Sequence, residues 1–264
     1  MITLYAAHMR YSVLQQFQYR AANYFYMIGM IAEPVVYLVV WSTIARAHGG
    51  SIDGLTPGGF AAYYIVWTLV RNMNIVLTPF AWEERIKDGT FAGQLMKPVH
   101  PIHEDIAGFM GWKLVVLLLW VPIAIVLVLL FRPTLSPTLL QGVVFFFAIW
   151  GAYLIRAIMQ WSLGLITFWT TRVAAIFEAY YLSETLLSGR VFPLVLMPKW
   201  FQTLTWYFPF RWSFSFPIVA LTGPIEDRDL FIGIGMQVAW ILFGIGLLYL
   251  VWPRAVRRFS SVGG

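Results

Sequence analysis

Long apolar runs separated by short polar stretches make up most of the chain. A helix that crosses a membrane needs about 20 mainly apolar residues, and six segments of the sequence meet this requirement. We expect spanning helices over residues 24–44, 60–82, 114–131, 139–169, from 173 onward, and over 230–252. The dipeptide Glu33-Pro34 predicts a break in the first span, because proline removes a helical hydrogen bond.

Residues 1–22 follow a different pattern. Apolar side chains recur every four residues at Tyr5, Met9, Val13 and Phe17. This spacing places them on one helical face, so we expect an amphipathic helix in the membrane interface. The alternative is a helix that faces water.

The connection over residues 190–225 is unusual. It holds five of the 14 prolines, and ten of the 25 residues from Phe192 to Phe216 are aromatic. Non-helical backbone at membrane depth persists only where protein or a water-filled cavity surrounds it. We therefore expect a re-entrant pair of short helices on the outer side, with Trp200, Trp206, Tyr207 and Trp212 at headgroup level. A seventh span is the alternative.

The composition agrees with this pattern. Hydrophobic residues make up 60% of the 264 residues and charged residues 11%, whereas soluble domains have roughly 45–50% and about 25%. The mean hydropathy is +0.73. A soluble enzyme is thereby excluded, and the sequence predicts one all-α transmembrane domain over residues 1–264. The lack of cysteine excludes disulfides, thiolate metal sites and cysteine nucleophiles.

The net charge of +6 indicates membrane orientation rather than a nucleic-acid partner. On a six-span frame, ten basic residues lie on the side of both termini and six on the other. The ten include Lys113, assigned to a loop, and the six include Arg190. Because Lys and Arg gather in cytoplasmic loops, we expect a multi-pass protein of the cell membrane with both termini in the cytoplasm.

Four charged residues inside the predicted spans are candidates for function. Intramembrane charges are usually paired. At about 1.5 Å per residue, Glu33 lies at the same depth as Arg71, and Arg156 at the same depth as Glu184. We expect both combinations to form ion pairs between spans, which either hold helices together or contact a substrate.

The most polar region is the loop over residues 83–105. Glu83 and Lys87 are four residues apart, a favourable helical pair. Asp88-Gly89 should end that helix, and an apolar pattern predicts a second short helix before Pro98. A compact element with an apolar face and a charged rim suits docking to another protein, although a merely solvated loop is the alternative.

Two chemical interpretations of this loop compete with docking. His100, His103, Glu104 and Asp105 carry side chains that bind zinc in proteins, but Pro101 prevents a regular helix from bringing the two histidines together. His100 and Asp105 also have the spacing of the general base and its partner in glycerolipid acyltransferases. Both interpretations are weaker than docking.

No phosphate-binding motif of the form G-x-x-x-x-G-K-[ST] and no G-x-S-x-G elbow occurs in the sequence. Any energy for transport must therefore come from a partner or from an ion gradient.

Three features together resemble the permease subunit of type-2 ABC exporters: the surface helix, the stretch ERIKDGTFAGQLMKPVHP after the second span, and the stretch LSGRVFPLVLMPKWFQTLTWYFPF before the last. The resemblance implies a pair of identical or related permeases with two separate ATPase subunits, which would bind the ATP and magnesium. It implies that this chain is not itself an enzyme. By position, the residues of ATPase coupling would be Glu83, Arg85, Lys87, Gly89, Leu95 and Pro98, and the residues of an outer gate would be Pro193, Pro198, Trp200 and Pro209.

The substrate stays open at this point. Largely uncharged, aromatic spans suit a lipid, a hydrophobic drug or a glycolipid, and polysaccharide export is a rival. A secondary transporter that uses Glu33, Glu178 and Glu184 is the main alternative function, followed by a membrane-bound acyltransferase and by an assembly subunit.

Overall fold

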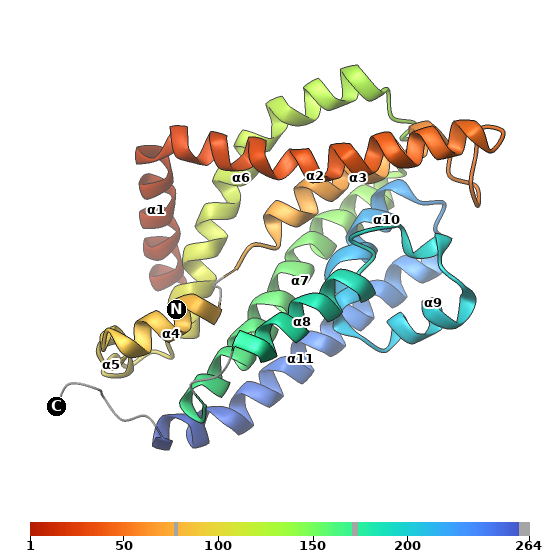
Figure 1. The fold of residues 1–264 in the computed structure, drawn as a ribbon. Helices are drawn as coiled ribbons and strands as arrows, with labels where there is room; N and C mark the ends of the chain where they lie inside the picture. The colour runs from red at the N-terminus through yellow and green to blue at the C-terminus, as the bar shows by residue number, and fades with distance from the viewer. Residues whose placement is uncertain (77–78, 171–173, 259–264) are drawn as a thin grey trace.

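The computed structural model describes residues 1–76, 79–170 and 174–258 (Figure 1). Within these ranges the regular structure is helical, apart from one isolated bridge between Ile52 and Leu55. The helices are α1 (Ile2–Gln18), α2 (Arg20–Ala47), α3 (Pro57–Met73), α4 (Pro79–Lys87), α5 (Thr90–Leu95), α6 (Ile102–Phe131), α7 (Leu139–Gly164), α8 (Ala174–Leu187), α9 (Lys199–Trp206), α10 (Phe216–Thr222) and α11 (Asp227–Arg258). The all-helical class predicted from the sequence is confirmed.

Four of these helices are long and apolar enough to cross a membrane. They are the greater part of α2, α6, α7 with its 3-10 extension Leu165–Phe168, and α11. The second and fifth predicted spans correspond to shorter helices, since α3 has 17 residues and α8 has 14. At ~1.5 Å per residue these are about 26 and 21 Å long, less than the ~30 Å hydrocarbon core. The prediction of six spans is therefore not confirmed.

Two details of the predicted spans are wrong. Helix α2 continues through Pro34 without a break, as membrane helices can when their surroundings satisfy the freed backbone groups. Helix α6 begins at Ile102, twelve residues before the predicted start, with Glu104 and Asp105 in its first turn, where carboxylates favour a helix N-terminus. Lys113 consequently lies inside α6 rather than in a loop.

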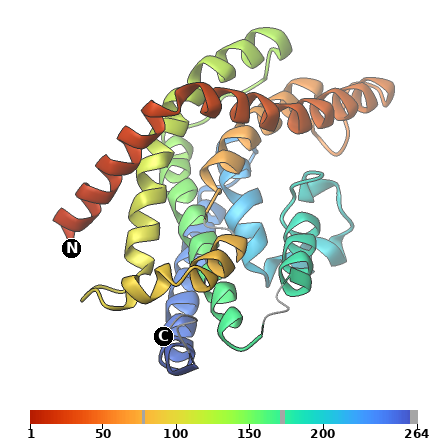
Figure 2. The same ribbon diagram turned by 60° about the vertical axis from the view of Figure 1, so that its left-hand side comes forward.

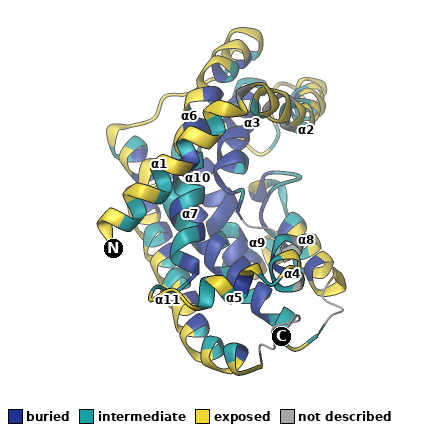
Figure 3. Ribbon diagram, turned by 90° about the vertical axis from the view of Figure 1, so that its left-hand side faces the viewer, coloured by how far each residue is buried: buried dark blue, intermediate teal, exposed yellow. Residues whose placement is uncertain are grey.

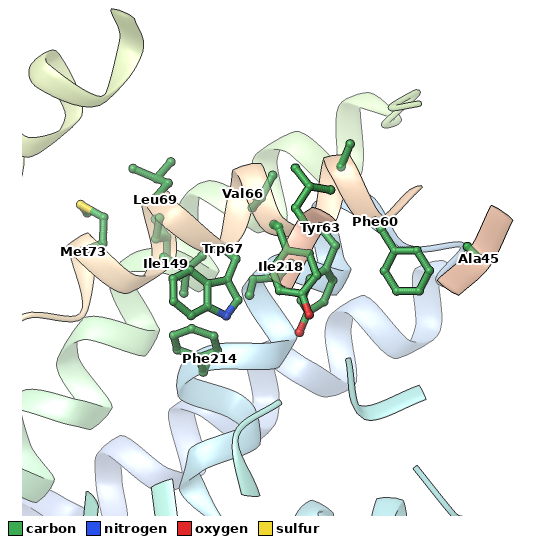
Figure 4. Close-up of a cluster of buried hydrophobic side chains, with 14 residues drawn as sticks. Ala45, Phe60, Tyr63, Val66, Trp67, Leu69, Met73, Ile149, Phe214 and Ile218 are labelled. Atoms are coloured by element: carbon green, nitrogen blue, oxygen red, sulfur yellow. The ribbon is translucent and has the colours of Figure 1, made fainter. Parts of the chain in front are cut away.

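The core of the protein surrounds α3. Every side chain from Phe60 to Val70 is buried. The N-terminus of α3 is capped, and its C-terminal end carries polar residues. Figure 4 shows Trp67 directly above Phe214, and their rings meet edge to face at 5.4 Å. In Figure 3 the buried residues gather on the central helices, whereas α1, α2 and α11 expose much of their surfaces. Helix α3 is thus held by protein on all sides.

Helix α1 packs along the first half of α6 (Figure 2). The backbone of Met9 lies so close to Gly111 that a Cβ there would collide with it. Val13 packs against Val115 and Val116, while Phe17 is exposed. The predicted stripe therefore faces α6 for most of its length.

Residues 190–225 form short pieces of helix. A 3-10 turn (Leu194–Leu196) and α9 precede a π-helical turn (Arg211–Ser215), which runs directly into α10. Helix α10 is buried against α3 and α7. Trp212 is buried in this core and not at a surface, and its ring N–H donates to the Trp206 carbonyl. The re-entrant course of this segment stays a prediction.

Candidate functional site

A break in the second predicted span forms a buried polar site. Helix α3 ends at Met73, and Asn74 caps it. The Lys113 ammonium of α6, fully buried, donates to the carbonyls of Asn72 (3.3 Å) and Ile75. The Arg156 guanidinium of α7 donates to the Asn74 carbonyl at 2.9 Å. Two cations thus satisfy the free carbonyls at a helix C-terminus, where positive charge is favourable.

The same site contains one of the predicted ion pairs. Arg156 lies 2.9 Å from the buried carboxylate of Glu184 on α8. The side-chain amide of Asn74 donates to the Ser213 carbonyl at 2.5 Å. The break in α3 is therefore bonded to α6, α7 and the π-helical turn, and Arg156 links it to α8.

The other predicted pair is part of a larger cluster. Arg71 lies 2.5 Å from the Glu33 carboxylate, and Arg190 lies 3.5 Å from the same carboxylate. Tyr37 donates to Glu33 at 3.4 Å, and both guanidiniums lie within 6 Å of the Trp67 ring, as cation–π contacts require. The pairing of Glu33 with Arg71 was predicted from their equal depth in the membrane. The same analysis assigned Arg190 to a loop and so missed its contact with Glu33.

One face of α3 holds the start of the 190–225 connection. Tyr63 donates to the Gly189 carbonyl at 2.9 Å, Trp67 to the Arg190 carbonyl at 2.9 Å, and Tyr64 to that of Val191 at 3.3 Å. Gly189 itself has a φ of +82°, a conformation that glycine adopts without strain. The aromatic side chains of α3 thus fix the backbone of residues 189–191.

Helices α4 and α5 form a compact unit with a buried base. Trp82 and Phe91 are fully buried, with ring centroids 5.0 Å apart. Arg85 makes two hydrogen bonds to Asp105 of α6, at 2.9 and 2.8 Å, and Asp105 also accepts from the Trp161 ring at 2.9 Å. Gly89, with φ of +69°, makes the turn between the two helices. The base is therefore fastened to α6 and α7.

The opposite side of this unit is exposed. Met96 has 84% of its surface exposed. Glu84, Asp88 and Pro98 are exposed too, while Glu83 and Leu95 are half-buried. We call the exposed residues Glu84, Asp88, Met96, Lys97 and Pro98 the tip. The side chain of Lys87 lies outside the described part of the structure.

The two histidines have separate partners. The His100 ring packs against Trp252 of α11 with centroids 4.0 Å apart, and its Nδ1 accepts from the Ile102 amide. His103 hydrogen-bonds the Tyr5 hydroxyl at 2.9 Å. Burial lowers the pKa of His100 to about 4, with a smaller contribution from His103. Among the described residues no cluster of three metal-binding side chains is found, and Asp105 is bonded to Arg85 and Trp161, so this geometry favours neither the metal nor the acyltransferase interpretation.

The four predicted gate residues are spread along the sequence of the 190–225 connection. Pro193 and Pro209 are buried, Pro198 precedes α9, and Trp200 is exposed on α9. Sequence reasoning missed Lys113, Asn74 and Arg190. The signal for Asn74 was present, because asparagine is frequent at helix ends, but the positions of the two cations depend on tertiary packing.

These features define an all-helical membrane protein with four candidate spans and a compact pair of short helices, α4 and α5. Residues 31–263 match the sequence model of the ABC-2 family transporter proteins. The match covers most of the chain, and the chain therefore belongs to this family as a permease of the ABC-2 type. No curated protein matches the sequence.

Proposed function

We propose that this chain is the membrane-spanning subunit of an ATP-driven exporter. Two permease copies, identical or related, would form the translocation path, and two ATPase subunits would bind beneath them in the cytoplasm. ATP and magnesium would be held by those partners. The family membership of residues 31–263 supports a transport role, and the steps below rest on the geometry of α4 and α5.

The observation that carries this proposal is the contrast between the base and the tip of the α4–α5 unit. The base is fixed by Trp82, Phe91 and the two hydrogen bonds from Arg85 to Asp105. The tip presents Met96 with charged neighbours to the outside. A fixed base with an exposed apolar centre and a polar rim is the anatomy of a protein interface. In this proposal Arg85 holds the unit in place, and the tip contacts the ATPase.

The break after α3 provides a route from this unit to the outer connection. Helix α4 follows the break in the chain, and Asn74 at the break bonds the Ser213 carbonyl. Above it, the α3 side chains Tyr63 and Trp67 hold the carbonyls of Gly189 and Arg190. A movement of α4 would therefore act on the 190–225 segment at two places, its start and Ser213. We propose that this segment is a re-entrant outer gate that includes Pro193, Pro198, Trp200 and Pro209.

The partner permease would bind along α2 and α8, since the other helices of this chain cover α3. Helix α2 exposes Phe25, Val36, Val39 and Val40, and α8 exposes Leu182. In this arrangement α3 and α8 would complete six crossings together with flanking residues. The apolar character of these faces supports a hydrophobic or amphipathic substrate, such as a lipid, drug or glycolipid.

An ion-coupled carrier has less support. It needs a carboxylate that can exchange its partner for a cation, whereas Glu33 already lies between two guanidiniums and Glu184 is buried against Arg156. Glu178 is exposed on α8 and forms no ion pair among the described residues. We therefore place the energy source in the ATPase.

The test is purification of the tagged chain in mild detergent, co-expressed with its neighbouring genes. We expect an ATPase subunit to purify with it in a fixed ratio and to hydrolyse ATP in a vanadate-sensitive manner. Met96→Asp should reduce the bound ATPase at least about tenfold, because it places a charge at the centre of an apolar contact. Leu135→Asp, at an exposed apolar residue of the loop between α6 and α7, is the matched control and should retain the ATPase. Purification of the wild-type chain without any ATPase would overturn the proposal.

A further inference from the structure

A large apolar cavity lies away from the proposed translocation path. Its volume is about 860 Å³, and it is formed mainly by α6, α7 and α11, with Tyr5 of α1 at one end. Apolar side chains such as Leu154, Ile158 and Ile245 make most of its wall. None of the four intramembrane charges lines it, and α7 and α11 run side by side in both Figure 1 and Figure 2. The cavity is therefore separate from the exposed faces of α2 and α8.

The length of the cavity matches one leaflet of a bilayer. Its wall on α11 extends from Ile241 to Pro253, a rise of about 18 Å at ~1.5 Å per residue. One leaflet contributes about 15 Å, half of the ~30 Å hydrocarbon core. The volume also falls within the roughly 300–1,000 Å³ of ligand-binding pockets. A single extended acyl chain fits these dimensions.

The end of the cavity near Pro253 has the chemistry of a membrane interface. Trp252 and the two histidines His100 and His103 line this end, and aromatic rings of this kind favour the headgroup region. Directly beyond Pro253, the exposed residues Arg254 and Arg257 occupy the last turns of α11. Basic residues at the end of a pocket between membrane helices attract anionic headgroups.

We propose that this cavity binds one anionic phospholipid, with an acyl chain between α6, α7 and α11 and its phosphate beside Arg254 and Arg257. The assignment to the cytoplasmic leaflet rests on the orientation in the proposed function, whereas the binding itself does not. The lipid would lie beside the base of the α4–α5 unit, since Trp252 lines the cavity and also contacts Phe91, with ring centroids 6.3 Å apart.

The test is native mass spectrometry of the purified chain after exposure to vesicles of equal amounts of phosphatidylglycerol and phosphatidylcholine. We expect one retained phosphatidylglycerol per chain. Ile245→Trp places a bulky ring in the cavity and should weaken retention roughly tenfold, since the loss of two buried methylenes already has an effect of that size. Leu242→Trp is the matched control, because Leu242 lies on the same helix, is more exposed and does not line the cavity.

A second variant keeps the test independent of folding in the apolar wall. The exposed double variant Arg254→Gln with Arg257→Gln should still retain one lipid, but without preference for phosphatidylglycerol. Equal retention by Ile245→Trp and Leu242→Trp would overturn the proposal, and so would an Ile245→Trp variant that changes the oligomeric state, which would indicate a second copy as the occupant. Because these measurements need only this chain, their outcome does not depend on whether an ATPase binds.

Discussion

Lys113 is a fully buried charged residue at the break after α3. Its side chain is fully buried, and its ammonium group reaches the carbonyls of Asn72 and Ile75 at the end of α3. The Trp112 ring lies 4.5 Å from the same nitrogen. A buried charge persists only where hydrogen bonds replace water. At the residue scale, therefore, the break in α3 and the cation that satisfies it depend on each other.

Lys113→Met should destabilise the protein. Methionine fills a similar volume, but it removes the ammonium donor from the Ile75 carbonyl and leaves the Asn72 carbonyl with only the Ile75 N–H, which costs about 1–3 kcal/mol. Thermal unfolding in detergent measures this loss. Lys199→Met, at an exposed position of α9, should change stability by no more than about 0.5 kcal/mol. Equal effects of the two variants would contradict the role of Lys113.

The pair of Glu33 and Arg71 can be tested by exchanging its charges. Arg71→Glu alone places two carboxylates together and should cost about 1.5–3 kcal/mol of stability. Adding Glu33→Arg should restore only part of this, because the new arginine at position 33 faces Arg190. Yield and thermal unfolding report the rescue. A double variant no better than the single one would show that the pair does not stabilise the fold.

His100 makes the stability of the region around the α4–α5 unit dependent on pH. Its pKa in the folded protein is about 4, below the ordinary value of 6.5, so the neutral ring is favoured by folding. Its contribution to stability is therefore complete above pH 6.5 and is lost as the pH falls from 6.5 toward 4. The protection factors of the amides of residues 83–101, which compare each exchange rate with its intrinsic rate at the same pH, should fall over this interval. His100→Phe should flatten this dependence, and an unchanged slope would exclude His100 as its cause.

At the scale of elements, two ion pairs connect the α4–α5 unit and the residues after it to α6, one of them buried and the other more exposed. The Asp105 carboxylate is almost wholly buried and binds Arg85, whereas the neighbouring Glu104 binds Lys97, half of whose side chain is exposed. Helices this short are not stable alone, so the position of the unit depends on such contacts.

Asp105→Asn should release this unit from α6. We expect faster hydrogen exchange over residues 83–99 and a cost of about 1.5–3 kcal/mol. Glu104→Gln is the matched control on the adjacent residue, and it should cost less than about 1 kcal/mol because its pair is exposed. The interpretation fails if the two variants behave alike.

The elements differ in how far the sequence predicts them. The charge-free runs within α6 and α11, residues 114–131 and 230–252, predict spanning helices directly, because about twenty consecutive apolar residues are long enough to cross a bilayer. The end of α3 at Met73 was not, since the run continues to Trp82 and only the tertiary contacts of Lys113 and Arg156 satisfy the break. Matched depth was enough to bring Arg156 to Glu184. It could not place Arg190, because that requires knowing that α8 is short.

At the scale of the whole molecule, the ends of the fold are joined through α3. Its C-terminal end is bonded to the cations Lys113 and Arg156, and its aromatic face holds residues 189–191. The α4–α5 unit and the C-terminal end of α11 lie toward one end of the bundle, and α9 lies toward the other (Figure 1). The central claim is that movement at the tip changes the position of the 190–225 segment.

The most direct test of this claim is a distance measurement across the outer end. Because the chain contains no cysteine, spin labels can be attached to Trp200→Cys on α9 and Leu135→Cys in the loop between α6 and α7. We predict that ATP with vanadate shifts the distance between these labels in the complex with the ATPase, and that Met96→Asp abolishes the shift. The same distance with and without nucleotide, in a complex that hydrolyses ATP, would contradict the account.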